Sequence, residues 1–457
     1  MTPQEVAERA LALSRTDGCI VLVDDSTSAN LRWAGNTLTT NGVTEGRTLT
    51  VLAFDGARLG AVSRTRVTAD AIEATVRAAE DAAAESEPED DAAPLITPAE
   101  SVSASWEEPA ERTSIGVFEH FAPALRDAFG AAGAAGHSLY GYAEHELTTT
   151  YLASSTGLRL RHPQPHGRLE LTARTPNGDR SSWTGQGTRD FRDVDIAAHA
   201  RVLAQRLDWS RRRLELPAGR YETLLPPSAV GDLMVYAYWS MTALDAVEGR
   251  TAFRKPGGGT RIGERLAELP LRLYSDPEMS GLQAAPFIAA GASSRRVSAF
   301  DNGLPLRSTD WIRDGELTAL VQTRHSAGIT GQPVTAQVGN LGLEAAGSQA
   351  SLDEMVATTQ RGLLLTCLWY VRMVDPQTLL VTGLTRDGVF LVEGGEVAGA
   401  VTNFRFNESP LDVLARATEA GRAEPTLPRE FGDYFTRTRM APLRVPDFNM
   451  SSVSPAS

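Results

Sequence analysis

The chain has 457 residues, of which 42% are hydrophobic and 22% charged, ordinary values for a globular protein long enough for two or three domains. Its 57 acidic and 44 basic side chains give a formal net charge of −13, which disfavours binding to nucleic acid or to an anionic membrane. Two cysteines far apart in the sequence, Cys19 and Cys367, exclude a disulfide framework and a cysteine-rich zinc site.

No apolar run approaches the roughly 18 to 20 residues that a membrane-spanning helix needs, and residues 1–15 carry acids instead of an apolar signal core. We therefore expect neither a membrane span nor a secretory leader, and we expect a cytoplasmic location. Lys255 is the single lysine among many arginines, a bias typical of a GC-rich bacterial genome.

The first 65 residues are predicted to form one helix followed by strands. The ranges are a helix over 3–15, strands over 19–26 and 31–42, and a hairpin over 47–65. Asn41-Gly42 should end the second strand and Asp55-Gly56 should turn the hairpin, because both dipeptides favour tight turns.

Residues 68–85 have a clear helical pattern, with Thr68 as the N-cap and Ile72 and Val76 on one face. The acidic, proline-bearing stretch 86–94 has no apolar periodicity and is predicted to be a surface loop. Further elements are predicted as a helix over 118–129, strands over 146–162 that turn at 155–157, and a helix over 193–210 opened by Asp193.

A change from helix to proline, glycine and a new apolar strand places a domain boundary near residue 216. The fold class is predicted as α+β, with an N-terminal α/β-sandwich-like domain over 1–216 and a β-rich C-terminal domain over 217–457 that contains a long helix over 228–248. Hairpin turns are predicted at 301–303, 314–315, 387–388 and 393–395.

The histidines provide no zinc-protease helix, which needs two histidines one turn apart with a glutamate beside the first. His145 has Glu146 beside it but no second histidine in reach, and its neighbours favour a strand. His162 and His166 flank Pro-Gln-Pro, which cannot continue a helix. We expect all three on surface strands or loops. No nucleophile elbow, phosphate-binding loop or dinucleotide fingerprint is present either, and Cys367 is expected to be a core residue.

Four segments, in their order and spacing, resemble the TldD/TldE (PmbA) metalloprotease family. They are residues 31–42, 216–234, 300–327 and 361–401. The third contains the pattern Asp-x-Gly-x-Pro-x-Arg, and the fourth contains GVFLVEGGE. The resemblance spans most of the chain, although each segment alone is only moderately specific.

The resemblance implies a two-subunit complex in which TldD binds zinc through a His-Glu-x-x-x-His helix and a later cysteine. TldE lacks these ligands and helps to close a chamber that takes in unfolded peptides as added β-strands. Alignment on the Glu-Gly that follows the helix places the histidines at Ser240 and Asp245 and the glutamate at Met241. Serine and methionine are poor zinc ligands, methionine cannot act as a base, and no cysteine follows in 437–457.

The leading hypothesis is therefore a non-catalytic TldE-like subunit with no cofactor of its own, a zinc-bearing TldD-like partner, and a peptide substrate. Residues expected to line the chamber are Glu248, Arg250, His325, Trp369 and Tyr370; the alternative for the last two is that they are strand residues packed in the core. An alternative is a homodimeric peptide-binding or regulatory protein without protease activity. A third possibility is a hydrolase with repurposed residues such as Asp245, Glu248 and His325.

Overall fold

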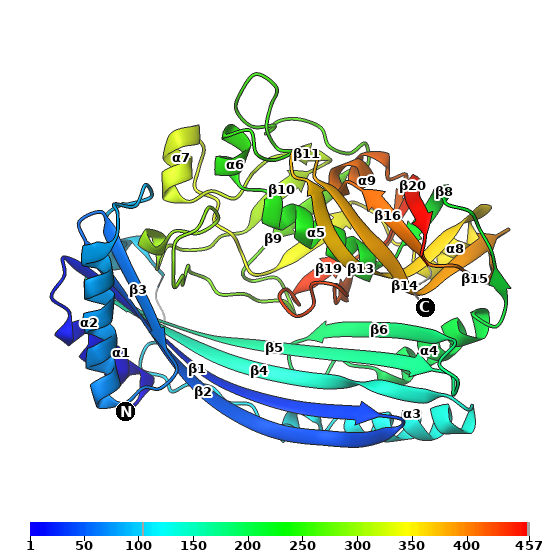
Figure 1. Cartoon of the computed structure of the whole chain (residues 1–457), viewed down its shortest axis with the longest axis horizontal. Coiled ribbons are helices and arrows are strands. Elements are labelled where there is room, and N and C mark those ends of the chain that lie inside the picture. The colour runs from blue at the N-terminus through cyan, green and yellow to red at the C-terminus, as the bar shows by residue number, and fades with distance from the viewer. Residues whose placement is uncertain (103–104, 455–457) are drawn as a thin grey trace.

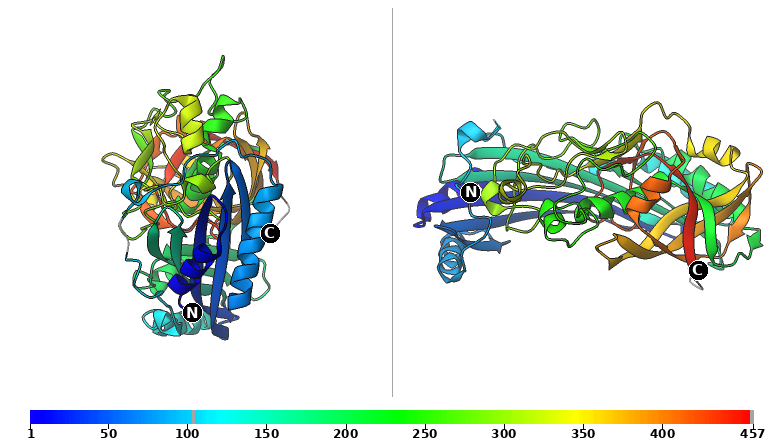
Figure 2. Two further views of the ribbon diagram at one scale, coloured as in Figure 1. Left: turned by 90° about the vertical axis from the view of Figure 1, so that its left-hand side faces the viewer. Right: turned by 90° about the horizontal axis from the view of Figure 1, so that it is seen from above.

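The computed structural model of the chain describes residues 1–102 and 105–454. One layer is a long six-stranded sheet formed by the first half of the chain, and the second half lies over one face of that sheet (Figure 1). Seen from above, the second half extends along the length of the sheet (Figure 2). The α+β, strand-rich fold class predicted from the sequence is confirmed.

The N-terminal sheet is antiparallel, in the order β3-β2-β1-β4-β5-β6. Its strands are β1 (Gly18–Ala34), β2 (Thr37–Asp55), β3 (Arg58–Arg64), β4 (Ser138–Ser154), β5 (Arg159–Arg174) and β6 (Ser181–Thr188). Alternation with a period of two gives the sheet two different faces. In β1, Val21, Val23, Ala29 and Leu31 are buried on one face.

Four helices cover that apolar face, one pair at each end of the sheet. Helices α1 (Pro3–Leu13) and α2 (Ala69–Glu85) pack with Val21 and Val23, and α3 (Ala122–Ala134) and α4 (Ile196–Trp209) pack with Ala29 and Leu31. The predicted N-cap of α2 is confirmed, because the Thr68 side chain accepts a hydrogen bond from Ala71 N–H. Helix α4 begins at Ile196, three residues later than predicted, since Asp195 and not Asp193 caps it.

The opposite face of the sheet is polar along most of its length. Asp24, Ser26 and Ser28 of β1 are half-buried there, next to Thr148 and Thr150 of β4. At one end the face becomes apolar, where the core made by Ile20, Leu22 and Leu152 includes residues of the second half such as Phe287 and Phe300. The polar part therefore lies beneath the second half without being sealed by an apolar core.

Two of the predicted turns are wrong, because tertiary pairing continues the strands through them. Asn41-Gly42 lies inside β2, opposite Leu31 and Asn30. The chain turns instead at Gly35-Asn36, where φ is 58° and 64° and the Asn36 side chain binds the backbone of His137 and Leu139. Asp387-Gly388 lies inside β14 at a β-bulge opposite β13.

The second half contains two further sheets, in the orders β11-β10-β9-β12-β19-β18 and β13-β8-β20-β16-β14-β15-β7, with β17 paired to β20. Their strands are β7 (Arg213–Leu214), β8 (Gly219–Leu225), β9 (Leu271–Ser275), β10 (Thr309–Arg313), β11 (Glu316–Leu317), β12 (Leu341–Ala345), β13 (Arg361–Asp375), β14 (Leu380–Glu393), β15 (Glu396–Val401), β16 (Phe404–Glu408), β17 (Glu419–Ala420), β18 (Glu424–Thr426), β19 (Thr438–Met440) and β20 (Leu443–Val453).

The helices of this half are α5 (Pro227–Ser240), α6 (Ala243–Val247), α7 (Arg324–Thr330), α8 (Leu352–Ala357) and α9 (Pro410–Arg416). Helix α5 is buried nearly all round, as its apolar sequence requires. Among the described residues no helix is long and apolar enough to cross a membrane.

The helix predicted over 228–248 is interrupted, because its backbone bonds to another segment at the break. Val321 N–H donates to Met241 C=O over 2.7 Å, and Ala243 N–H donates to Val321 C=O over 3.0 Å. These bonds take backbone groups that a continuous helix would need for its own i to i−4 ladder. Helix α5 therefore ends at Ser240, and the short helix α6 starts at Ala243.

Candidate functional site

A cavity of about 590 Å³ lies between the polar face of the N-terminal sheet and the second half of the chain. Its volume is in the range of small-molecule and peptide sites. One wall consists of sheet residues from β4 and β5, and the other comes from α5, from loops of the second half and from the segment before β19. The lining residues are Glu146, Thr148, Thr150, His162, Gln164, His166, Trp239, Ala285, Phe287, Ile288, Ala289, Ala290, Arg296, Val297, Asp301, Leu306, Gln322, Thr323, Ala336, Gln337, Val338, Gly339, Phe435 and Arg437.

The β5 wall is a row of polar side chains at alternate positions, His162, Gln164 and His166. The prolines between them, Pro163 and Pro165, are tolerated because β6 ends opposite Gly167, so this part of β5 has no neighbour on that side. Burial lowers the pKa of His162, and burial together with the charges of nearby arginines lowers the pKa of His166 to about 4. Both imidazoles are therefore neutral at physiological pH.

His145 does not belong to this wall. It lies on β4 and is only 4% exposed, with Nδ1 2.7 Å from Thr113 Oγ1 and Nε2 2.8 Å from Arg189 C=O. The expectation of a surface position is therefore wrong for His145. The tertiary partners that satisfy both ring nitrogens come from residues far from it along the chain.

The opposite wall is built on Trp239, the residue before the last residue of α5. Its ring packs edge-on against Phe431 at 5.1 Å between centroids, and Phe435 lies at 6.4 Å. The loop that carries both phenylalanines is fixed from inside α5. The carboxylate of Asp232, which is fully buried, accepts hydrogen bonds from the backbone N–H groups of three successive residues: Arg429, Glu430 and Phe431.

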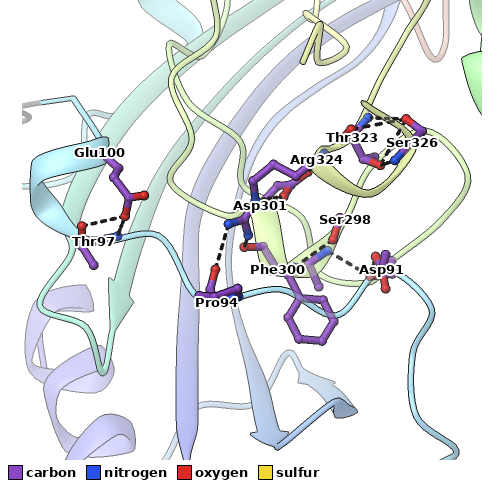
Figure 3. A network of polar contacts seen from close by, with 12 residues as sticks. Asp91, Pro94, Thr97, Glu100, Ser298, Phe300, Asp301, Thr323, Arg324 and Ser326 are labelled. Carbon is purple, nitrogen blue, oxygen red and sulfur yellow. Dashed lines mark hydrogen bonds and ion pairs between the residues drawn. The ribbon is translucent and has the colours of Figure 1, made fainter. Parts of the chain in front are cut away.

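A polar network connects the loop after α2 to the edge of the cavity (Figure 3). Arg324 donates to Asp301 Oδ1 over 2.5 Å and to Pro94 C=O over 2.9 Å. Ser293 donates to Asp91 over 2.8 Å. The acidic stretch predicted to be a surface loop therefore also connects the two halves of the chain. Asp301 lines the cavity, but its charge is balanced by Arg324.

Arg437 has a different environment from the other arginines near the cavity. Its Nε donates to Gly339 C=O over 2.8 Å. Among the described residues no carboxylate lies within ion-pair distance of its guanidinium, and neither η nitrogen has a protein acceptor. Burial without a carboxylate partner lowers the pKa of Arg437 to about 10, so the side chain still carries its charge at neutral pH.

The three positions aligned with a zinc site do not fit a metal ion. Ser240 donates to Tyr236 C=O over 3.0 Å, and the Met241 side chain is 1% exposed in the core. The Asp245 carboxylate is bound by Thr242 and by Arg295, which also binds Glu248. In the described part of the chain, no group of three or more His, Cys, Asp or Glu side chains is placed to hold a metal.

The five residues predicted to line the chamber lie outside the lining of this cavity. Glu248 is paired with Arg250 as well as with Arg295, and His325 is on α7, next to α6. Trp369 has Arg386 and Arg429 over its ring. Tyr370 is 53% exposed at a bulge of β13, with φ of 54°.

Sequence reasoning missed Trp239 and Arg437, and it considered His162 and His166 only as zinc ligands on a helix. The spacing of the two histidines does contain a usable signal. His-x-Gln-x-His with a period of two places all three side chains on one face of a strand. No local pattern identifies Arg437, because its position depends on contacts with distant segments.

Residues 218–452 match the family model of the PmbA/TldA metallopeptidase C-terminal domain, and residues 19–83 match the model of PmbA/TldA metallopeptidase domain 1. The chain belongs to the PmbA/TldD metallopeptidase family. No curated protein matches its sequence.

Solved structures of other proteins share the fold of this chain. TldE from Thermococcus kodakarensis is 15% identical with a TM-score of 0.80, over 98% of this chain and 99% of that one. A proposed modulator of DNA gyrase from Bacteroides thetaiotaomicron is 14% identical with a TM-score of 0.76, and the match covers 99% of this chain and 98% of that one. A proposed modulator of a DNA gyrase from Thermotoga maritima is 15% identical with a TM-score of 0.75, and the match covers 98% of this chain and 99% of that one.

Proposed function

We propose that this chain is the non-catalytic, TldE-like subunit of a heterodimeric zinc metallopeptidase that cleaves unfolded or precursor peptides. The observation that carries the proposal is the state of the three aligned positions 240, 241 and 245, which run from the end of α5 into α6. Ser240 caps a carbonyl of its own helix, Met241 is in the core, and Asp245 is bound to Arg295. Zinc and the catalytic base would then come from a TldD-like partner.

In this role the chain contributes a peptide-binding surface and part of a chamber wall. The cavity next to α5 offers a polar sheet face on one side and aromatic side chains such as Trp239 and Phe435 on the other. The edge of the N-terminal sheet also supports peptide binding. Within the described residues β3 covers β2 only along Leu49–Asp55, so the outer edge of 37–47 is free to accept an added strand.

The decisive experiment compares the chain alone with the chain co-expressed with a homologue that has an intact His-Glu-x-x-x-His helix. We expect the two chains to form a stable one-to-one complex that contains zinc and cleaves unfolded peptides. We expect the lone chain neither to contain zinc nor to cleave peptides. Stoichiometric zinc and peptide cleavage by the lone chain would contradict the proposal. A stable homodimer that binds peptides but never associates with such a homologue would favour the alternative role as a peptide-binding or regulatory protein.

A gain-of-ligand variant tests whether the end of α5 has truly lost the site. In the triple variant Ser240→His, Met241→Glu, Asp245→His, the new side chains do not lie on one helix, because the helix is broken at 241–242. We expect no stoichiometric zinc after purification and a lower free energy of unfolding than in the wild type, since a carboxylate is placed in the core and the bond to Arg295 is lost. Metal analysis and urea unfolding measure both, and zinc bound at one equivalent would show that the geometry is intact.

A further inference from the structure

Four charged side chains line the cavity, and they differ in their surroundings. The carboxylate of Asp301 is paired with Arg324, whereas Arg296 and Glu146, which accepts a hydrogen bond from Thr148 over 2.7 Å, are exposed to solvent. Arg437 donates from Nε to Gly339 C=O, and in the described part of the chain neither of its η nitrogens has a protein acceptor. Keeping a half-buried cation without a carboxylate partner costs free energy, and its unused donors are available to an anion.

The guanidinium of Arg437 is held in a fixed orientation, as an anion site requires. A Cβ added to Gly339 would lie 3.0 Å from its Nη2, so the absence of a side chain at 339 leaves room for the guanidinium plane. The neighbouring wall is made of neutral hydrogen-bonding groups, His162, Gln164 and His166. The Gln164 amide already donates to the carbonyl groups of Pro165 and Gln283, and His162 Nε2 lies 3.3 Å from Gln164 Oε1. His166 contacts Thr436 through Nδ1, so its Nε2 is the neutral group of this wall that can donate to an anion.

The apolar residues of the lining indicate the chemistry of the part of the ligand that Arg437 does not bind. Trp239, Phe287, Ile288 and Phe435 form an apolar surface opposite the sheet. A small inorganic anion would leave this surface uncovered, whereas a ligand with an apolar body and one acidic group matches both parts. Arginine binds carboxylates through two parallel hydrogen bonds, which suits its free η nitrogens.

We propose that this cavity binds a peptide through a carboxylate group held by Arg437, with apolar side chains of the peptide against Trp239 and Phe435. The identification of the ligand as a peptide rests on the proposed function. The carboxylate is either the C-terminus of the peptide or the side chain of an aspartate or glutamate. The cavity thus selects peptides by the position of one negative charge, in addition to any selection by the zinc-bearing subunit.

The test uses the purified full chain and isothermal titration calorimetry with four N-acetylated peptides. The first pair is Ala-Phe-Leu-Ala with a free carboxylate and with a C-terminal amide. The second pair is amidated Ala-Phe-Glu-Ala and amidated Ala-Phe-Gln-Ala. We expect the carboxylate member of at least one pair to bind tenfold or more tightly, in line with a charge-assisted bidentate contact. The pair that shows the difference identifies the source of the carboxylate.

Arg437→Met should abolish this preference. Arg437→Lys should retain only part of it, because lysine keeps the positive charge but lacks the planar guanidinium that forms two parallel hydrogen bonds. Arg254→Met is the matched control. It removes an exposed arginine of the second half that does not line the cavity, and it should keep the preference. Arg296→Met tests the other arginine of the lining. Circular dichroism establishes that each variant is folded.

Equal binding of carboxylate and amide peptides to the wild type, or an unchanged preference in Arg437→Met, would overturn the inference. So would a preference that depends on Arg296 instead. A complex with the partner that cleaves peptides normally, while the lone chain shows no carboxylate preference, would overturn this inference and leave the proposed function intact. Carboxylate-dependent binding by a chain that never associates with a zinc-bearing homologue would overturn the proposed function and leave this inference intact.

Discussion

Asp232 fixes a cavity wall through three backbone hydrogen bonds, although it is one of the most buried charged residues of the chain. Replacement by alanine leaves those N–H groups without an acceptor, and each buried unsatisfied donor costs roughly 1 to 3 kcal/mol before relaxation. We expect Asp232→Ala to lower the free energy of unfolding by about 3 kcal/mol in urea titrations. Asp127→Ala on α3, where the side chain is 77% exposed, should change it by less than about 0.5 kcal/mol. Similar values for the two variants would contradict this role.

His166 should make the chain sensitive to acid. Burial and neighbouring arginines lower the pKa of His166 to about 4 in the folded state, against about 6.5 when unfolded. The unfolded chain therefore takes up the proton first, so this contribution to stability is complete above pH 6.5 and is lost as pH falls towards 4. We expect the free energy of unfolding, measured in urea at about pH 7 and about pH 4.5, to fall less between these pH values in His166→Gln than in the wild type. Identical losses would contradict the prediction, and some loss should remain because burial also lowers the pKa of His145 and His162.

At the scale of single residues, sequence reasoning succeeds where the partner is local. The Thr68 cap could be predicted because its acceptor role depends on a residue three positions away. The environment of Arg437 could not be predicted in this way, because Gly339 is 98 positions away and the β5 wall with His162 and His166 comes from the other half of the chain. The positions aligned with a zinc site were located only by resemblance, and the bond between Asp245 and Arg295 needed the fold.

Among the elements, helix α2 depends on a close approach to strand β3 at Gly60. A Cβ added there would lie 2.0 Å from Ala79 C=O and 2.3 Å from Ala83 N, both backbone atoms of the helix. Gly60→Ala must therefore displace α2, and we expect a loss of at least about 2 kcal/mol in the free energy of unfolding. Gly130→Ala, inside α3 with nothing within 4 Å, should instead add about 0.5 to 1 kcal/mol. Urea unfolding of both variants provides the comparison, and equal effects would exclude the steric explanation.

Element boundaries were predictable where periodicity alone determines them. The apolar face of α2 is fixed by its own sequence, so its range was nearly correct. The helix over 228–248 was predicted as continuous because nothing in its composition breaks it. Its interruption comes from hydrogen bonds to Val321, a residue about eighty positions later. The turn signals at Asn41-Gly42 and Asp387-Gly388 failed for the same reason, since strand pairing overrode local preference.

At the scale of the whole molecule, the two layers are joined at both ends. Arg324 and its neighbours connect the loop after α2 to the second half at one end. At the other end, near β6 and β13, Trp183 and Trp369 lie on opposite sides of the interface with Arg429 between them. The division into domains near residue 216 remains a prediction, and these contacts indicate that the two parts unfold together.

Arg429 tests that cooperativity directly. Its guanidinium lies 5.1 Å from the Trp183 ring centroid and 4.5 Å from that of Trp369, and it pairs with Glu170 of β5 over 3.0 Å. Two cation–π contacts of about 0.5 to 1 kcal/mol each and a partly buried ion pair give an expected loss of about 2 kcal/mol in Arg429→Gln. Because the contacts with Trp183 and Glu170 cross between the layers, their loss should weaken the coupling of the layers as well as lower the melting temperature.

Scanning calorimetry separates these two effects. We expect the wild type to melt in one transition and the Arg429→Gln variant to show a calorimetric enthalpy larger than its van't Hoff enthalpy, the sign of two units that melt separately. Arg386→Gln is the matched control, because Arg386 lies 5.6 Å from the same Trp369 ring but belongs to β14 within the second half. It should lower the melting temperature slightly and leave the transition single. A single transition in both variants would mean that the contacts around Arg324, and not this arginine, hold the layers together.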